Sequence, residues 1–168
     1  MEEIVNRVAN SGLITLNLED YFKGVKIQPY NIGDNLWQGI VLKEKDFRVF
    51  VKDNDWSFYK DAYVNLFCSE DAVIPSWAYL LLTVALEPYA KKVIYGSSED
   101  LDKVIVDNVI DSLDLAQFKE GRVIVKGCSS TPHAEYALVR LTTKLKPVVK
   151  SLMFGEPCST VPIYKKSK

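Results

Sequence analysis

The sequence lacks the features that mark several large classes of protein. Its 168 residues carry a formal net charge of −1, so it has no bulk positive charge for gripping nucleic-acid phosphates. The longest apolar run, residues 77–86, contains Thr83 and falls short of the roughly 20 residues that a membrane helix needs. The N-terminal segment carries two acidic residues, Glu2 and Glu3, which signal and transit peptides usually lack. We expect a cytoplasmic protein with no nucleic-acid and no membrane partner.

Several catalytic motifs are also missing. No G-x-x-x-x-G-K-[ST] occurs, which argues against a P-loop, and no G-x-G-x-x-G follows a strand-like segment, which argues against a common dinucleotide site. The sequence has one histidine and no G-x-S-x-G, so a hydrolase triad has little support. Whether the chain is an enzyme stays open, and a non-enzymatic role is favoured.

The composition is that of a globular protein. Apolar residues make up 48% and charged residues 26% of the chain, and the length suits one domain with a full core. We expect a single domain over 1–168. Its N-terminal section, 1–60, is read as β-rich with a short helix, and the section 61–168 is read as α/β.

The N-terminal section shows mainly strand-like patterns. A short helix is predicted at 2–9, and strands are predicted at 13–18, 25–30 and 36–42. Phe47, Phe50 and Val51 have the spacing of a helix with one buried face.

After residue 61, strands and helices alternate. Strands are predicted at 62–67, 92–96, 122–127 and 151–155. A helix over 75–87, apolar nearly all round, should be buried on most sides. Another helix should begin at a capping box formed by Ser97 and Asp100, and a third should follow Thr131. The alternation predicts an α/β fold: a mixed sheet with a parallel β-α-β-α-β-α-β core at about 61–155, with the N-terminal strands at its edge.

An internal repeat links two parts of this core. When residues 77–96 are shifted by 59 positions, seven of the 20 aligned pairs with 136–155 are identical. The identical pairs are Ala78/Ala137, Leu82/Leu141, Thr83/Thr142, Leu86/Leu145, Pro88/Pro147, Lys91/Lys150 and Gly96/Gly155. Convergence on shared apolar positions is the alternative, and we favour an internal duplication of a strand–helix–strand unit.

The three cysteines follow predicted strands. Cys68, Cys128 and Cys158 each come just after a strand of the core, where the carboxyl ends of parallel strands gather ligands and reactive groups. Together with His133, the only histidine, they could supply the thiolate and imidazole ligands of a zinc ion or an iron–sulfur cluster. The sequence therefore suggests a metal site formed by Cys68, Cys128, Cys158 and His133.

Two other interpretations of the cysteines remain open. Free cysteine is often packed as a small buried apolar side chain, and this would suit a non-catalytic interaction or structural protein. A cysteine at a helix N-terminus can also be an activated nucleophile, which would suit a thiol-dependent enzyme.

The chain also resembles a known bacterial family. The segments SGLITLNLEDY, LWQGIVLKEKDFRVF, VIPSWAYLLLTVALEPYAKKV and SLMFGEPCSTVPIYKK are similar to the family catalogued as domain of unknown function 2480. The resemblance brings no established activity. The resemblance implies that the genes of this family often lie beside iron–sulfur assembly genes. On that basis we expect an accessory role in iron–sulfur or metal handling, with iron–sulfur assembly proteins as partners. A homo-oligomer is compatible with this expectation.

Overall fold

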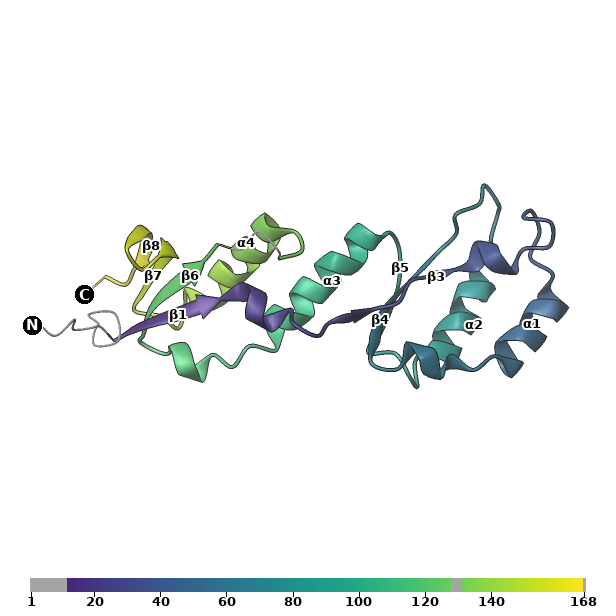
Figure 1. Cartoon of the computed structure of the whole chain (residues 1–168), viewed down its shortest axis with the longest axis horizontal. Helices are drawn as coiled ribbons and strands as arrows, with labels where there is room; N and C mark the ends of the chain where they lie inside the picture. Colours follow the sequence, from purple (N-terminus) through teal and green to yellow (C-terminus); the bar gives the residue numbers. More distant parts are fainter. Residues whose placement is uncertain (1–11, 128–130, 168) are drawn as a thin grey trace, which may run out of the picture. The chain divides into compact units, whose positions relative to one another are not determined.

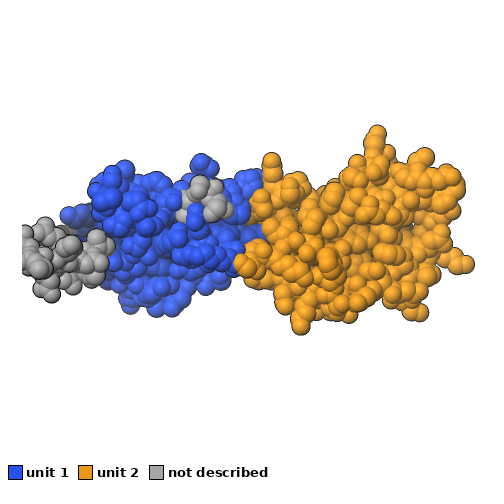
Figure 2. All heavy atoms as spheres, viewed as in Figure 1, with its two compact units in different colours: residues 1–23, 103–168 blue, residues 24–102 orange. Residues whose placement is uncertain are grey.

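The chain divides into two compact units. A computed structural model describes residues 12–127 and 131–167. Unit 1 consists of residues 1–23 and 103–168, and unit 2 consists of residues 24–102 (Figure 2). The expectation of a single domain over 1–168 stays a proposal. The contacts within the chain divide it into these two units.

Unit 1 is built on a four-stranded sheet with the order β1-β6-β7-β8 (Figure 1). Its strands are β1 (Leu13–Asn17), β6 (Arg122–Lys126), β7 (Ser151–Glu156) and β8 (Ser159–Lys165). Strands β1, β6 and β7 are parallel, and β8 pairs with β7 in the antiparallel direction. The short 3-10 helices η1 (Leu18–Tyr21) and η4 (Ala116–Phe118) lie in the connections.

The core of unit 1 lies on one face of this sheet. Alternate strand residues, including Leu16, Val123 and Leu152, are buried there. They pack with one side of helix α4 (Ala134–Leu145) and with the later turns of helix α3 (Ser98–Asp111), which is divided between the units at residue 102. The buried side of α4 consists of Ala137, Leu141 and Leu145.

Unit 2 is built around the central strand β4 (Ala62–Phe67). Strands β2 (Lys26–Ile27) and β3 (Tyr30–Asn31) pair with it in one constant register, and β5 (Lys92–Tyr95) pairs on its other side, all in parallel. Pro29 separates β2 from β3, as expected on an edge strand, where the missing N–H breaks no inner ladder. The Gln28 N–H still donates to the Tyr63 carbonyl at 3.0 Å, so the ladder continues.

Two helices cover one face of the unit 2 sheet. Helices α1 (Glu44–Asp53) and α2 (Ser76–Leu86) contact each other, and both contribute to one apolar core with β4. Trp56, in the 3-10 helix η3 (Trp56–Tyr59), is anchored because its indole N–H donates to the Val51 carbonyl at 2.9 Å. A further 3-10 helix, η2 (Ile32–Asn35), follows β3.

The predicted α/β class is confirmed, but the prediction that the four core strands share one sheet is wrong. β4 and β5 lie in one sheet, whereas β6 and β7 lie in another. The N-terminal strands explain the difference: β1 pairs with β6, and β2 and β3 pair with β4. They therefore extend two separate sheets, each through parallel pairing, instead of adding an edge to a single one.

The predictions for the N-terminal section hold in part. The strand at 13–18 is β1, the strand at 25–30 is divided into β2 and β3, and the predicted helix around Phe47 is α1. The prediction of a strand at 36–42 is wrong, because only an isolated bridge joins Trp37 to Val41. The chain turns back between these two residues at Gln38 and Gly39, which both have a positive φ. The predicted helix at 2–9 lies outside the described residues.

Helix α2 is less buried than its composition predicts. Ala78, Leu82 and Leu86 are fully buried, but Leu80 and Val84 are 68% and 72% exposed. Only one side of the helix packs on the sheet and on α1, so its opposite side keeps apolar residues on the surface. Among the described residues, none of the helices is long and apolar enough to cross a bilayer.

The two units share features that a duplication predicts. Tyr63 pairs with Lys92 and Arg122 pairs with Ser151, so the same 29 residues separate the paired positions in both. The helix between the paired strands buries equivalent residues in each unit. These residues are Ala78, Leu82 and Leu86 in α2 and Ala137, Leu141 and Leu145 in α4. We propose that the units descend from one strand–helix–strand element.

The burial of α2 leads to a stability prediction. Leu82→Ala should lower the free energy of unfolding by about 2–5 kcal/mol, because it leaves a cavity in the core of unit 2. Leu80→Ala, on the exposed side of the same helix, should change it by no more than about 0.5 kcal/mol. Urea denaturation of the two variants checks this, and equal losses would contradict the packing of α2.

Candidate functional site

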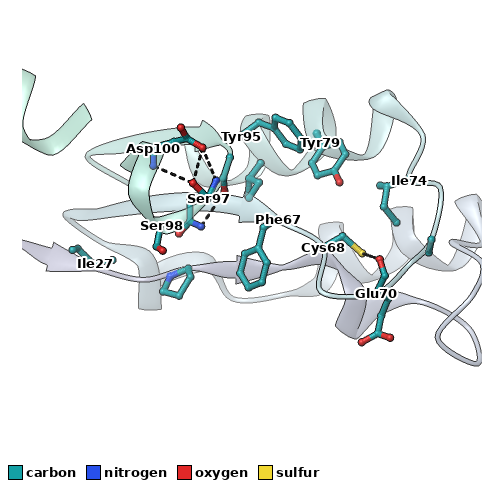
Figure 3. A pocket seen from close by; sticks show the side chains of 15 residues that line it. Ile27, Phe67, Cys68, Glu70, Ile74, Tyr79, Tyr95, Ser97, Ser98 and Asp100 are labelled. Atoms are coloured by element: carbon teal, nitrogen blue, oxygen red, sulfur yellow. Dashed lines mark hydrogen bonds between the residues drawn. The ribbon is translucent and has the colours of Figure 1, made fainter. Parts of the chain in front are cut away.

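A pocket of about 980 Å³ opens at the carboxyl edge of the unit 2 sheet (Figure 3). The ends of β4 and β5 and the loops that follow them form most of its wall. This is the edge at which parallel sheets usually bind ligands. Its lining includes Asn65, Cys68, Glu70, Tyr79, Tyr95 and Asp100.

Asn65 forms the buried polar part of this wall. It lies in β4 on the face opposite to the core residues Val64 and Leu66, and only 4% of its surface is exposed. Its side-chain Nδ2 donates to the Gly96 carbonyl at 3.2 Å. The amide therefore ties β4 to the turn that follows β5.

The N-terminus of helix α3 forms one end of the pocket (Figure 3). The predicted capping box is confirmed: the Ser97 N–H donates to Asp100 Oδ2 at 2.9 Å, and the Asp100 N–H donates to Ser97 Oγ at 3.2 Å. Gly96 precedes it with φ of 149°, and a Cβ at this position would lie 2.8 Å from Asp100 Oδ2. A larger residue here would therefore crowd the Asp100 side chain of the cap and strain the backbone.

Cys68 and Glu70 lie toward the other end of the pocket (Figure 3). Cys68 is partly buried beside the unit 2 core, and its thiol donates to the Glu70 carbonyl at 3.5 Å. Asn31 holds this loop in place, because its Oδ1 accepts from the Ser69 N–H at 3.0 Å and its Nδ2 donates to Ser69 Oγ at 2.9 Å. The position of the thiol is therefore set by β3 as well as by β4.

Two tyrosines contribute aromatic surface to the pocket. The rings of Tyr79, from α2, and Tyr95, from β5, meet edge to face with their centroids 4.9 Å apart. Burial raises the pKa of Tyr79, and the neighbouring Tyr95 and Cys68 raise it further. Tyr79 therefore presents a neutral hydroxyl at physiological pH.

The predicted metal ligands are distributed over both units. Cys68 belongs to unit 2, whereas His133 and Cys158 belong to unit 1, and Cys128 lies outside the described residues. His133 is the residue before α4, and its side chain makes no capping hydrogen bond. Cys158 is exposed in the turn between β7 and β8.

The expectation that all three cysteines follow strands of one sheet is wrong, because those strands lie in two sheets. Within residues 12–127 and 131–167, no three His, Cys, Asp or Glu side chains are grouped so that they could hold a metal ion. A site that includes Cys128 stays a prediction.

Sequence reasoning placed Cys68 at the correct edge but missed the rest of the pocket. Asn65 had a visible signal, since it is the one amide in the apolar strand AYVNLF. Glu70, Tyr79 and Tyr95 had none, because they come from a loop, a helix and a strand end that only the fold brings together.

Comparisons with known proteins place the chain in one family. A family model described as "Protein of unknown function (DUF2480)" matches residues 2–166. Searches of curated proteins and of solved structures gave no match.

The closed cap next to the pocket leads to a second prediction. Gly96→Ala should destabilise the protein by about 1–3 kcal/mol, because it adds a Cβ at a positive φ and displaces Asp100 from the cap. Gly24→Ala is the matched control, since Gly24 also has a positive φ, 79°, but nothing within 4 Å of the added Cβ. Thermal or urea unfolding should show the larger loss for Gly96→Ala, and an equal loss would mean that the cap does not depend on this glycine.

Proposed function

The chain belongs to the family of proteins of unknown function DUF2480, and from its pocket geometry we propose that it acts by binding a small molecule in unit 2. The observation that carries this proposal is the pocket wall itself. A nearly fully buried amide, Asn65, and a partly buried thiol, Cys68, face a space of about 980 Å³ at the edge where parallel sheets bind ligands.

The wall is fixed before any ligand arrives. Asn31 holds the loop of Cys68, Asn65 holds the turn at Gly96, and the capping box holds the start of α3. Each contact joins different parts of the chain or closes a helix end. Such a preformed wall reduces the ordering cost of binding, which suits a binding protein.

A binding role is favoured over the thiol-dependent enzyme. An activated thiolate usually has a cation or an imidazole beside it. The thiol of Cys68 instead donates to a backbone carbonyl, and the described lining residues include no lysine, arginine or histidine. We therefore assign Cys68 to the wall of the binding site.

Alkylation of Cys68 tests the binding role. In a Cys128→Ser, Cys158→Ser background, N-ethylmaleimide should attach only to Cys68 and fill part of the pocket. Fragments that bind the untreated protein in ligand-observed NMR should lose their binding after this treatment. A Cys68→Ser, Cys128→Ser background, alkylated at the exposed Cys158, is the control and should keep them. Fragment binding that survives alkylation of Cys68 would contradict the proposal.

The hypothesis of a thiolate metal or iron–sulfur site, with an accessory role in iron–sulfur or metal handling, remains a second proposal. One feature supports it: β6 and β7 are neighbours, Cys158 lies two residues after β7, and Cys128 comes two residues after β6 in the sequence. Thiolates from neighbouring strand ends are suitable ligands for zinc or for a cluster.

Metal content tests this second proposal. Protein purified without oxygen should contain stoichiometric zinc or iron, and Cys158→Ser should remove most of it. His133→Ala should lower the content as well, whereas Ser159→Ala, next to Cys158, is the control and should not. Elemental analysis showing no stoichiometric metal, or a metal that persists in the Cys158→Ser variant, would overturn it.

A further inference from the structure

We infer that two copies of the chain associate through the free edge of the unit 2 sheet, by antiparallel pairing of β5 with β5 of a second copy. The inference does not rest on the proposed binding function. It follows from the unpaired backbone of β5, from the strand that covers the equivalent edge in unit 1, and from the side chains that two copies of β5 would place opposite each other.

β5 is an edge strand with one open side. It pairs with β4, and in the described part of the chain no strand pairs with its other side. The Gly96 N–H donates to the Leu66 carbonyl at 3.2 Å, so alternate residues, Ile94 and Gly96, direct their backbone groups toward β4. The N–H and C=O groups of Val93 and Tyr95 therefore point to the open side, where they form a template for another strand.

Unit 1 shows which kind of partner covers such an edge. In the internal repeat, β5 corresponds to residues 151–154 of β7, and β7 pairs with β6 as β5 pairs with β4. The other side of β7 is covered by β8, which runs in the antiparallel direction. Unit 2, whose residues 24–102 are all described, has no strand in the place of β8. An antiparallel strand is therefore the partner that this edge fits.

Prolines distinguish the edge at β5 from two other edges. Pro29 interrupts the opposite edge of the unit 2 sheet, between β2 and β3, and Pro162 lies within β8 of unit 1. A proline lacks the N–H that a further strand would need, so it discourages pairing at an edge. β5 contains no proline, and its open side keeps its full set of donors and acceptors.

The pairs between β7 and β8 show which side chains suit this edge. Phe154 lies opposite Val161, and Leu152 lies opposite Tyr164. Each pair joins an aromatic side chain to an aliphatic one, a combination that stabilises antiparallel strands. A partner for β5 should therefore offer an aliphatic and an aromatic residue at alternate positions.

A second copy of β5 offers this combination. Pairing centred on Ile94 would place Tyr95 opposite Val93 of the second copy, and Val93 opposite Tyr95 of the second copy. Lys92 would lie opposite Gly96 of the second copy, so like charges would not face each other directly. The strand is thus complementary to itself, and we assign the second copy as its partner.

Tyr95 adds apolar surface to this edge. Its side chain is 72% exposed, and its ring meets Tyr79 of α2 edge to face with the centroids 4.9 Å apart (Figure 3). Phe154, at the equivalent position beside β8, is partly buried. Pairing with a second copy would cover part of the Tyr95 ring in the same way and remove apolar surface from water.

Sedimentation equilibrium of the full chain tests for the dimer. At about 100 μM protein, a concentration that suits a small interface, the mass should approach twice the 19.0 kDa of one chain. On dilution the mass should return toward that of one chain. A mass that stays at the value of one chain at the high concentration would overturn the inference.

Charge variants of Tyr95 assign the dimer to β5. In the proposed pairing the two Tyr95 side chains are diagonal neighbours, about 7–8 Å apart. Tyr95→Lys and Tyr95→Glu should each weaken the homodimer by about tenfold or more, because like charges then meet across the edge. An equimolar mixture of the two variants should form a heterodimer, which native mass spectrometry resolves by mass and which also shows that both variants fold.

Val84→Lys is the matched control. Val84 is also 72% exposed, but it lies two helical turns after Trp77, whose ring is 6.0 Å from that of Phe47, so it is on the side of α2 that faces α1. The added lysine should leave the dimer intact. Dimers that persist in both Tyr95 variants, or that Val84→Lys disrupts equally, would overturn the assignment to β5. Tyr95 variants that stay monomeric when mixed would overturn the antiparallel pairing.

Discussion

The parallel pairing of β4 on both of its sides is the constraint on which unit 2 depends. Tyr63 pairs with Ile27 on one side and with Lys92 on the other, so the strands run in the same direction and end at the same edge. The chain must leave this edge in loops, and two of these loops, together with the start of α3, form the pocket. The pocket is therefore a consequence of strand direction.

Polar contacts convert this edge into a defined site. The alternation along β4 directs Val64 and Leu66 to the core and leaves Asn65 on the other face. A buried amide without partners would be costly, and its bond to the Gly96 carbonyl offsets part of that cost. The same bond fixes the Asn65 side chain in the wall of the pocket.

Much of the local structure could be predicted from the sequence. Periodicity placed α1, β4, α2, β5 and β6 close to their observed positions, and the spacing of Ser97 and Asp100 predicted a cap that forms. The position of Cys68 after a buried strand placed it at the edge where the pocket lies. The exposed side of α2 was missed, because a helix that is apolar all round gives no sign of which side a neighbour covers.

The sequence by itself determined most of the strands and helices, the segment 36–42 and β8 aside, together with the apolar faces of the strands and the cap at Ser97, because these depend on residues close together in the chain. Only the tertiary structure decided that β5 and β6 belong to different sheets and that Glu70, Tyr79 and Tyr95 share one pocket. The choice of a strand's partner depends on long-range packing, and a period of two residues specifies a face but not a neighbour.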